Sequence, residues 1–491
     1  MPPRPDFSRE AFDAEAAKLA KRAATEPQVA AMIACVRNSF DLPFDQALAA
    51  ERQAFLDLLQ DPRSKALRHV FFAEREAAKI AGLPPGTKPR EVTRAAVLGA
   101  GTMGAGIAMC FANAGIPVRV IETDEAAMQR GIERIRATYE ASVTRRSLTP
   151  EARDARMALI EGAVGLEAAK DADVIVEAVF EEMGLKKQVF ATLDRVAKPG
   201  AVIASNTSYL DIDEMAAATS RPGDVLGMHF FSPANVMKLL EVVRARHTAP
   251  DALATAAEIG RKLGKVPVVV GVCFGFVGNR MLARRTQQVE RLLLEGALPQ
   301  QVDKALTDFG FRMGPCAMGD LAGLDIGWRI RKATGKRAPV ADALVEAGRL
   351  GQKTGKGYYL YPEGARAGVP DPDVAAMIEA LSAQEGVARR TLGQAEILDR
   401  LLLPMVNEGA RILEDGIAAR PGDIDVVWLH GYNWPAWQGG PMHWADARGL
   451  AEVAARLGAF AEASRDDSLR PAPLLLRLAA EGKTFASLKA G

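Results

Sequence analysis

The hydrophobic pattern changes character at two points along the chain. Over residues 1–90, apolar side chains recur at helical spacing, most clearly at 46–60 and 65–80. The stretch 82–90 then breaks this pattern with three prolines and two glycines. We therefore predict an N-terminal helical segment that ends in a linker.

Residues 91–272 alternate short apolar runs with helical stretches. The runs are AAVLGAG, VRVIE, ADVIVEAV, AVIAS, DVLGMHFFS and KVPVVVG. Short apolar strands that alternate with helices are typical of a mostly parallel sheet with helices on both faces. The pattern predicts an α/β domain over this range.

From residue 273 the pattern is helical throughout and contains a repeat. The same short motifs occur in the same order in residues 292–325 and in residues 412–450. Each segment has an acidic residue near a glycine, then Val or Ile followed by Asp, then a glycine, a Gly-Pro pair, an acidic residue and a Gly-Leu pair. Their offset of about 120 residues is too long for a solenoid repeat. We expect two copies of one all-α domain, over 273–385 and 386–491.

Charge and composition exclude several classes of function. The chain has 491 residues, and its 62 basic residues are balanced by 61 acidic ones, which argues against a nucleic-acid-binding protein. The four cysteines and five histidines show no metal-ligand spacing, so we expect no metal site.

The beginning of the chain and its apolar runs bear on location. The start, MPPRPDFSRE, has no apolar run and carries early acids, unlike a targeting signal. No apolar run reaches the roughly 18 residues that a membrane span needs. The expected compartment is the cytoplasm.

The first strand of the α/β domain leads into a glycine-rich turn. Gly99, Gly101 and Gly104 form G-x-G-x-x-G between a strand and a helix, and Glu122 ends the next strand. In a Rossmann-type nucleotide-binding domain, such a turn takes the pyrophosphate and such an acid meets the ribose hydroxyls. We predict NAD rather than NADP, because an acid there repels a 2′-phosphate. The turn also contains Thr102 and Met103.

Four polar residues suit the oxidation of an alcohol. The reaction needs a base, a group that holds the base, and donors that fix the oxygen. His229 follows a strand, Glu241 lies twelve residues later, and Ser208 and Asn279 stand at element ends. Each also fits a structural role, as a core histidine, a surface acid or a helix cap.

Several motifs together resemble the 3-hydroxyacyl-CoA dehydrogenase family. They are GAGTMGAGIA, VEAVFEEMGLKKQVF, ASNTSYL, GMHFFSPANVMKLLEVV and GFVGNR, in this order. The resemblance is close over 94 to about 360. The second helical copy, ending in GYNWPAWQGGPMHWAD, is similar to the C-terminal domain of multifunctional fatty-acid oxidation proteins, and RHVFFAEREAAKI is similar to their linker after the enoyl-CoA hydratase domain.

The resemblance implies a role for each matching residue. His229 would take the 3-hydroxyl proton while hydride passes to NAD, Glu241 would hold the imidazole, and Ser208 and Asn279 would bind the substrate oxygen. Further positions match residues that approach the cofactor: Glu181, Lys186, Ser232 and Lys353. Of these, Ser232 stands where the family often has Asn, and Lys353 follows a stretch of altered length.

The implied function is NAD-dependent oxidation of (S)-3-hydroxyacyl-CoA to 3-oxoacyl-CoA in fatty acid β-oxidation. Ninety N-terminal residues are too few for a hydratase domain, so we expect no hydratase activity; the chain is a truncated relative or a piece of a larger protein. Two duplicated helical copies favour a monomer or a subunit of a fatty-acid oxidation complex. Two alternatives stay open: a dehydrogenase of another small hydroxy substrate, and a scaffold subunit with weak catalysis.

The helix after Glu122 differs from the family pattern, so the resemblance assigns no CoA-binding residue there. Arg130, Arg134 and Arg136 are possible phosphate partners, but a solvated helix face is the favoured interpretation of their spacing.

Overall fold

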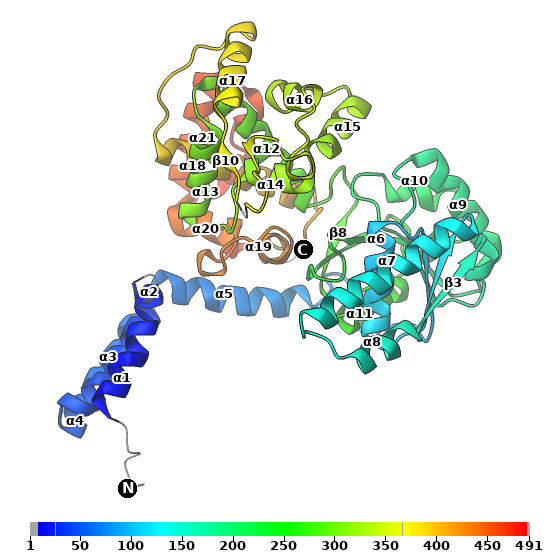
Figure 1. Cartoon of the computed structure of the whole chain (residues 1–491), viewed down its shortest axis with the longest axis horizontal. Coiled ribbons are helices and arrows are strands. Elements are labelled where there is room, and N and C mark those ends of the chain that lie inside the picture. The colour runs from blue at the N-terminus through cyan, green and yellow to red at the C-terminus, as the bar shows by residue number, and fades with distance from the viewer. Residues whose placement is uncertain (1–7, 25, 366, 489–491) are drawn as a thin grey trace. The chain divides into compact units, whose positions relative to one another are not determined.

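The computed structural model describes residues 8–24, 26–365 and 367–488. The chain divides into two compact units, one of residues 1–69 with 436–439 and one of residues 70–435 with 440–491 (Figure 1). Residues 1–7 of the expected N-terminal segment and 489–491 of the expected second helical copy lie outside the described residues. Among the described residues, no helix is both long and apolar enough to span a membrane.

The N-terminal segment is helical, as its apolar spacing predicts. Its helices are α1 (Arg9–Lys18), α2 (Ala20–Ala23), α3 (Pro27–Asp41), α4 (Phe44–Gln60) and α5 (Pro62–Ala77). Ser8 caps α1 by accepting a hydrogen bond from the backbone of Ala11. Arg9 pairs with Asp41 at 2.5 Å and so ties the start of α1 to the end of α3.

An eight-stranded sheet forms the centre of the α/β domain, in the order β3-β2-β1-β4-β5-β6-β7-β8. All neighbours pair in parallel except β6 and β7, which are antiparallel because a short connection joins them. The strands are β1 (Ala95–Leu98), β2 (Val118–Glu122), β3 (Ile160–Val164), β4 (Val174–Glu177), β5 (Val202–Ser205), β6 (Val225–Phe230), β7 (Leu239–Arg244) and β8 (Val266–Gly271). Strand order reverses between β1 and β4, and in doubly wound sheets ligands bind beyond the carboxyl ends of the strands at this point.

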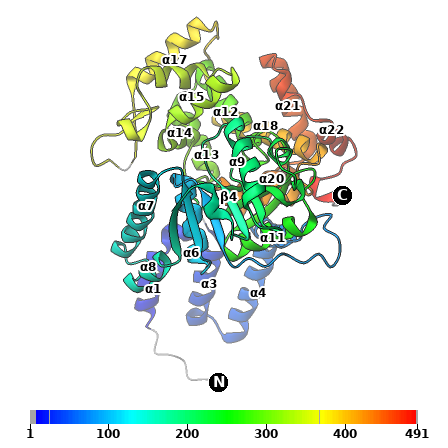
Figure 2. The ribbon, with the colours of Figure 1, turned by 90° about the vertical axis from the view of Figure 1, so that its right-hand side faces the viewer.

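Helices cover both faces of this sheet, which is why its strands are apolar at successive positions. Ala95 and Val97 pack into one hydrophobic core, whereas Ala96 and Leu98 pack into another on the opposite face. The helices around the sheet are α6 (Thr102–Asn113), α7 (Glu125–Thr144), α8 (Pro150–Met157), α9 (Met183–Val196), α10 (Ile212–Ala216) and α11 (Pro250–Lys262) (Figures 1 and 2). The predicted Rossmann-type architecture is confirmed.

The remainder of the chain is helical apart from a small hairpin. The part with the first repeat contains α12 (Gly278–Glu295), α13 (Pro299–Phe309), α14 (Pro315–Ala322), α15 (Leu324–Thr334), α16 (Pro339–Glu346), β9 (Tyr359–Leu360), β10 (Val369–Pro370) and α17 (Pro372–Gln384). The part with the second contains α18 (Gln394–Glu414), α19 (Pro421–Gly431), α20 (Pro441–Arg448), α21 (Leu450–Ser464) and α22 (Pro473–Ala480). The long helices α12 and α18 pack against each other.

The repeated sequence letters correspond to repeated helix caps. Asp303 accepts hydrogen bonds from the backbone of Cys316 (2.8 Å) and Ala317 (3.0 Å) at the start of α14. Asp425 likewise accepts hydrogen bonds from the backbone of Met442 (2.7 Å) and His443 (3.3 Å) at the start of α20. The glycine of each G-P pair lies against this aspartate, since an added Cβ at Gly314 or Gly440 would come within 2.3 Å of it.

The second acid and the G-L pair are repeated in space as well. Asp320 accepts hydrogen bonds from the backbone of residues 358 and 359, and Asp446 accepts them from 485 and 486, so each acid anchors a segment that returns to its own copy. Gly323 and Gly449 are the N-cap residues immediately before α15 and α21, and both have φ of 98°. The predicted duplication of an all-α domain is confirmed.

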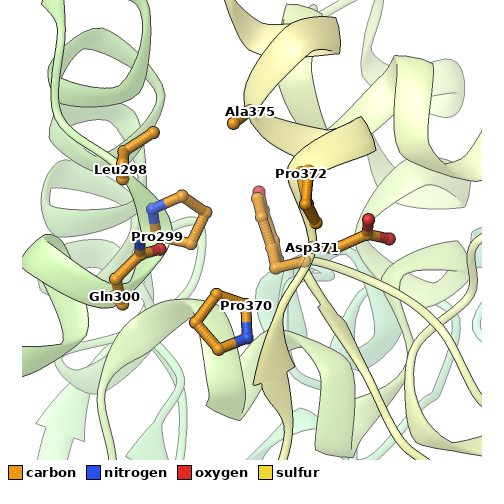
Figure 3. Close-up of a pocket in the computed structure, with 8 residues that line it drawn as sticks. Leu298, Pro299, Gln300, Pro370, Asp371, Pro372 and Ala375 are labelled. Carbon is orange, nitrogen blue, oxygen red and sulfur yellow. The ribbon is translucent and has the colours of Figure 1, made fainter.

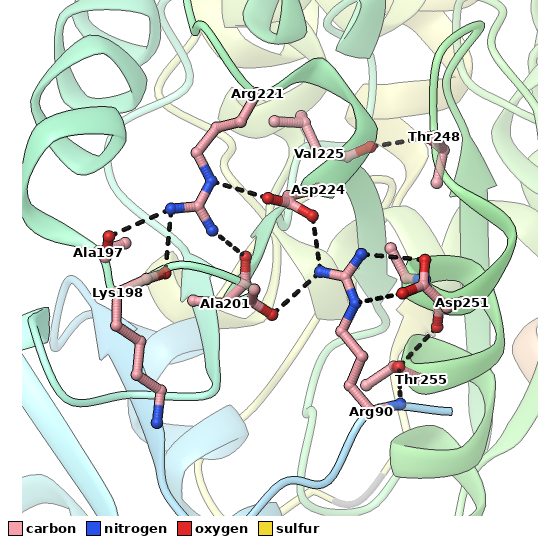
Figure 4. A network of polar contacts seen from close by, with 12 residues as sticks. Arg90, Ala197, Lys198, Ala201, Arg221, Asp224, Val225, Thr248, Asp251 and Thr255 are labelled. Carbon is pink, nitrogen blue, oxygen red and sulfur yellow. Dashed lines mark hydrogen bonds and ion pairs between the residues drawn. The ribbon is translucent and has the colours of Figure 1, made fainter. Parts of the chain in front are cut away.

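The linker is fastened to the α/β domain by Arg90 (Figure 4). Its guanidinium donates to Asp251 at 2.9 and 3.0 Å and to Asp224 at 2.6 Å, while its backbone N–H donates to Thr255. Arg221 donates to the other oxygen of Asp224 at 2.8 Å. The side chains of Arg90 and Asp224 are 20% and 18% exposed, so this ion pair is largely shielded from water, whereas Asp251 is 45% exposed.

We predict that Arg90→Met lowers the free energy of unfolding by about 1–3 kcal/mol, because two carboxylates lose a partly buried partner. Urea unfolding followed by circular dichroism measures the change. Lys304→Met is the matched control: Lys304 pairs with Asp308 on an exposed face of α13, so its loss should cost less than about 0.5 kcal/mol. Equal losses in the two variants would contradict the anchoring role.

Candidate active site

The glycine turn has the shape that a dinucleotide phosphate requires. Gly99 has φ of 91°, and an added Cβ there would lie 2.7 Å from the carbonyl oxygen of Ala178. An added Cβ at Gly104 would lie 1.8 Å from the carbonyl oxygen of Gly99, so the start of α6 packs directly on the turn. Beside Gly101, in contrast, an added Cβ would meet no atom within 4 Å. The N-terminus of α6 has no side-chain cap, which leaves its N–H groups for an anion.

Glu122 stands at the end of β2 and reaches the same turn. Its carboxylate accepts hydrogen bonds from the backbone of Ala100 (2.7 Å) and Thr123 (3.1 Å). Arg119, on the same strand, instead pairs with Glu161 and Asp171 at 3.0 and 2.7 Å. The charge beside the turn at the end of β2 is therefore negative, which suits ribose hydroxyls and not a 2′-phosphate.

The other residues predicted in the turn begin α6. Thr102 and Met103 are the first residues of this helix. Thr102 accepts a hydrogen bond from Arg134 at 3.3 Å, and Arg130, Arg134 and Arg136 are all exposed.

His229 and Glu241 form a buried pair across two neighbouring strands. They are direct partners in the antiparallel register of β6 and β7. The Nδ1 of His229 lies 2.7 Å from Glu241 Oε2, and the two residues are 4% and 0% exposed. The carboxylate thus holds the proton on Nδ1 and leaves Nε2 as the atom that accepts a proton.

The second oxygen of Glu241 is held by the start of α12. Oε1 accepts hydrogen bonds from the backbone N–H groups of Val277 (3.2 Å) and Gly278 (3.0 Å). Backbone N–H groups at a helix start are good partners for a buried carboxylate, so this contact satisfies the second oxygen of Glu241 inside the protein. Glu241 is a buried acid and not a surface one.

Ser208 lies on the free side of the imidazole. Its Oγ is 3.2 Å from His229 Nε2, and its backbone N–H donates to Glu181 at 3.0 Å. The helix that follows, α10, is capped by Asp211. The alternative role of Ser208 as a helix cap is therefore wrong, and its hydroxyl is left beside the histidine.

A buried ion pair supports the loop that carries Ser208. Lys186 donates to Glu177 at 2.7 Å with both side chains fully buried, and it lies 3.3 Å from Glu181. Glu177 also accepts from Ser205 at 2.6 Å, and Glu181 from Thr207 at 2.5 Å.

Sequence reasoning missed Glu177, although an acid at the end of the apolar strand VIVE was an available signal. Lys186 and Glu181 link the helix α9 to the loop after β5; their predicted contact with the cofactor stays a prediction.

Asn279 is the second residue of α12, next to the N–H groups that hold Glu241. Its Oδ1 accepts a hydrogen bond from the hydroxyl of Tyr432 at 2.8 Å. Phe231 packs on both His229 and Tyr432, with ring centroids 4.4 and 5.6 Å apart. The structure therefore gathers Ser208, His229, Glu241 and Asn279 into one cluster.

Two predicted cofactor residues lie outside this cluster of hydrogen bonds. Ser232 is exposed and lies two residues after the end of β6. Lys353 pairs with Asp325 of α15, in the helical part of the chain. Their cofactor contacts stay predictions.

A cavity of about 200 Å³ opens in the helical part of the chain, and its lining includes none of the four candidate catalytic residues (Figure 3). Leu298 and Pro299 on one side face Pro370 and Pro372 on the other. These residues lie beyond the C-terminal end of α12, whereas Asn279 lies at its N-terminal end, about 27 Å away for a helix of 18 residues.

The doubly wound sheet, the glycine turn with its acid, and a histidine–carboxylate pair define a nicotinamide-dinucleotide-dependent dehydrogenase. The NAD-binding domain of 3-hydroxyacyl-CoA dehydrogenases matches residues 94–273 of this chain. The C-terminal domain of the same enzymes matches residues 275–361 and, a second time, residues 397–491. The chain belongs to the 3-hydroxyacyl-CoA dehydrogenase family, and its α/β domain is the NAD-binding domain of that family.

Named relatives agree with this assignment. A peroxisomal bifunctional enzyme of Danio rerio is 43% identical over 92% of this chain and 66% of its own length. A fatty acid oxidation complex subunit alpha of Shewanella amazonensis is 39% identical over 95% of this chain and 66% of its own. The chain thus spans about two thirds of the length of these relatives.

Solved structures show the same fold. The chain resembles 3-hydroxybutyryl-CoA dehydrogenase of Escherichia coli with a TM-score of 0.70 and 27% identity, over 80% of this chain and 99% of the other. It resembles the dehydrogenase part of multifunctional enzyme 1 of C. elegans with a TM-score of 0.63 and 31% identity, over 83% and 96%.

We predict that Glu122→Ala weakens NAD binding about tenfold or more, because it removes a charged hydrogen-bond acceptor beside the glycine turn. Titration calorimetry with NAD and with acetoacetyl-CoA measures both affinities, and only the first should change. Glu161→Ala, on the neighbouring strand β3, is the matched control. An unchanged NAD affinity in Glu122→Ala would show that the ribose assignment is wrong.

Proposed function

We propose that this chain oxidises the 3-hydroxyl group of (S)-3-hydroxyacyl-CoA to the 3-oxo group with NAD, in fatty acid β-oxidation. The observation that carries this proposal is the buried His229–Glu241 pair with Ser208 and Asn279 beside it. Family membership and the names of the relatives support the substrate class.

The geometry supports a role for each residue. Nε2 of His229 would take the proton of the substrate hydroxyl, and Glu241 would stabilise the imidazolium that forms. The hydroxyl of Ser208 and the amide of Asn279 would donate hydrogen bonds to the oxygen as it becomes a carbonyl. Bound NAD supplies the acceptor for the hydride that leaves C3.

The residues around the glycine turn would hold the dinucleotide. The open space beside Gly101 and the uncapped start of α6 suit its pyrophosphate, and Glu122 suits its adenosine ribose. We assign the nucleotide domain to 91–272, the helical copies to 273–385 and 386–491, and the helical segment with its linker to 1–90.

The alternative that the chain is a scaffold subunit with weak catalysis, which docks a partner, has one observation in its favour. The first unit exposes large apolar side chains, such as Met32, Phe44 and Phe55, each with more than 60% of its surface accessible. Glu241 nevertheless holds His229 and the start of α12 through a buried hydrogen-bond network, which a docking role does not require. A dehydrogenase that also contacts a partner is the better account. A different small hydroxy substrate would require a different acyl pocket around the same four residues.

We further propose that the chain acts as a monomer or as a subunit of a fatty-acid oxidation complex, in the cytoplasm. The packing of α12 against α18 within one chain supports the proposed oligomeric state, since the two helical copies already cover one another. Its four cysteines are free thiols, which suits a reducing compartment.

The first experiment follows absorbance of NADH, and separately of NADPH, with purified protein and acetoacetyl-CoA. We predict rapid loss of NADH and little loss of NADPH. We also propose that the same preparation does not hydrate crotonyl-CoA. Loss of neither cofactor would contradict the proposed function, and hydration would contradict the proposed restriction to one activity.

We predict that His229→Ala lowers kcat by about 10²- to 10⁴-fold, the usual contribution of a positioned general base. NAD affinity should stay nearly constant, since the glycine turn is unchanged. The control is His247→Ala, which removes an exposed histidine of the same domain. Activity of His229→Ala within tenfold of the wild type would exclude His229 as the base.

A further inference from the structure

The start of α12 brings the second helical copy into the reaction centre. The N–H of Gly278 donates to Glu241, and an added Cβ at Gly278 would lie 2.4–2.8 Å from ring and hydroxyl atoms of Tyr432. The ring of Tyr432 therefore fills the space that a side chain at position 278 would need. Tyr432 directly follows α19, in the second copy.

Tyr432 is held on two faces. Its ring stacks on Trp428 with centroids 4.5 Å apart and meets the edge of Phe231 at 5.6 Å. Phe231 in turn packs on His229 at 4.4 Å. Aromatic packing therefore holds the ring that carries the Tyr432 hydroxyl.

That hydroxyl controls which way the amide of Asn279 faces. It donates to Asn279 Oδ1 at 2.8 Å. Burial raises the pKa of Tyr432 well above its usual value, and the charge of Glu241 raises it further, so the hydroxyl stays protonated and remains a donor. With Oδ1 engaged, the Nδ2 of Asn279 is the atom left to donate a hydrogen bond.

We propose that Tyr432 is a positioning residue, which acts on the substrate oxygen through Asn279. The inference rests on the proposed function, in which a developing carbonyl oxygen needs donors. A rotated amide would present its own oxygen to that atom and repel it. The second helical copy then completes the active site, in addition to packing against the first copy.

The test is Tyr432→Phe, which keeps the ring and removes only the hydroxyl. We expect kcat for acetoacetyl-CoA reduction to fall about tenfold, as for the loss of one well-aligned hydrogen bond, with KM for NADH unchanged. The matched control is Tyr139→Phe, because Tyr139 donates to Asn113 Oδ1 at 2.9 Å inside the nucleotide domain. Equal kcat in Tyr432→Phe and the wild type would overturn the inference.

A double-mutant cycle separates positioning from a general structural effect. In an Asn279→Ala background, Tyr432→Phe should change kcat less than twofold, since the group that it positions is absent. A further tenfold loss there would show that Tyr432 acts elsewhere and would overturn the proposal. Melting temperatures of the four proteins establish that all are folded.

Substrate binding tests the inference independently of turnover. If the wild type shows no turnover, the proposed function fails, but calorimetric titration with acetoacetyl-CoA still measures the contact of Asn279 with the ligand. Several-fold weaker binding in Tyr432→Phe than in Tyr139→Phe supports positioning by Tyr432. Equal binding in these two variants overturns it.

Discussion

The carboxylate of Glu241 is the contact on which the arrangement of the reaction centre depends. One oxygen holds His229, and the other accepts the first N–H groups of α12. A buried carboxylate is stable only when its hydrogen bonds are satisfied, and here the sheet and the helical part each supply some of them. The same group therefore orients His229 and fixes the start of α12, which carries Asn279.

The antiparallel step between β6 and β7 makes this contact possible. Side chains of directly opposed residues lie on the same side of an antiparallel pair, so the register places His229 and Glu241 together. A one-residue slip would place the two side chains on opposite faces of the sheet.

The two helical copies share their internal construction but not their surroundings. Each contains an aspartate that caps the following G-P helix, and each contains a second aspartate that anchors a later segment. Only the first copy contributes α12 and Asn279, whereas the second contributes Tyr432. The shared aspartates therefore serve packing within each copy, whereas Asn279 and Tyr432 come from different copies and meet in one hydrogen bond.

The sequence alone determined the elements whose signals are local. The alternation of short apolar runs and helices predicted the sheet, the glycine spacing predicted the nucleotide turn, and the letters of the repeat predicted the duplicated domain. These features depend on backbone conformation and burial within a few residues, so they can be recognised without tertiary structure. The motifs also supplied the four candidate catalytic residues, through resemblance to a family.

Only the tertiary structure decided which of these residues meet, and through which partners. Asn279 and Tyr432 are 153 positions apart, and nothing in the local pattern around either residue encodes their hydrogen bond. The buried partner of Lys186 was likewise not predicted, because periodicity shows that a strand is buried but not which charge its last residue faces. Local pattern sets the conformation of a segment, whereas long-range packing selects its neighbours, and the chemistry of this site depends on those neighbours.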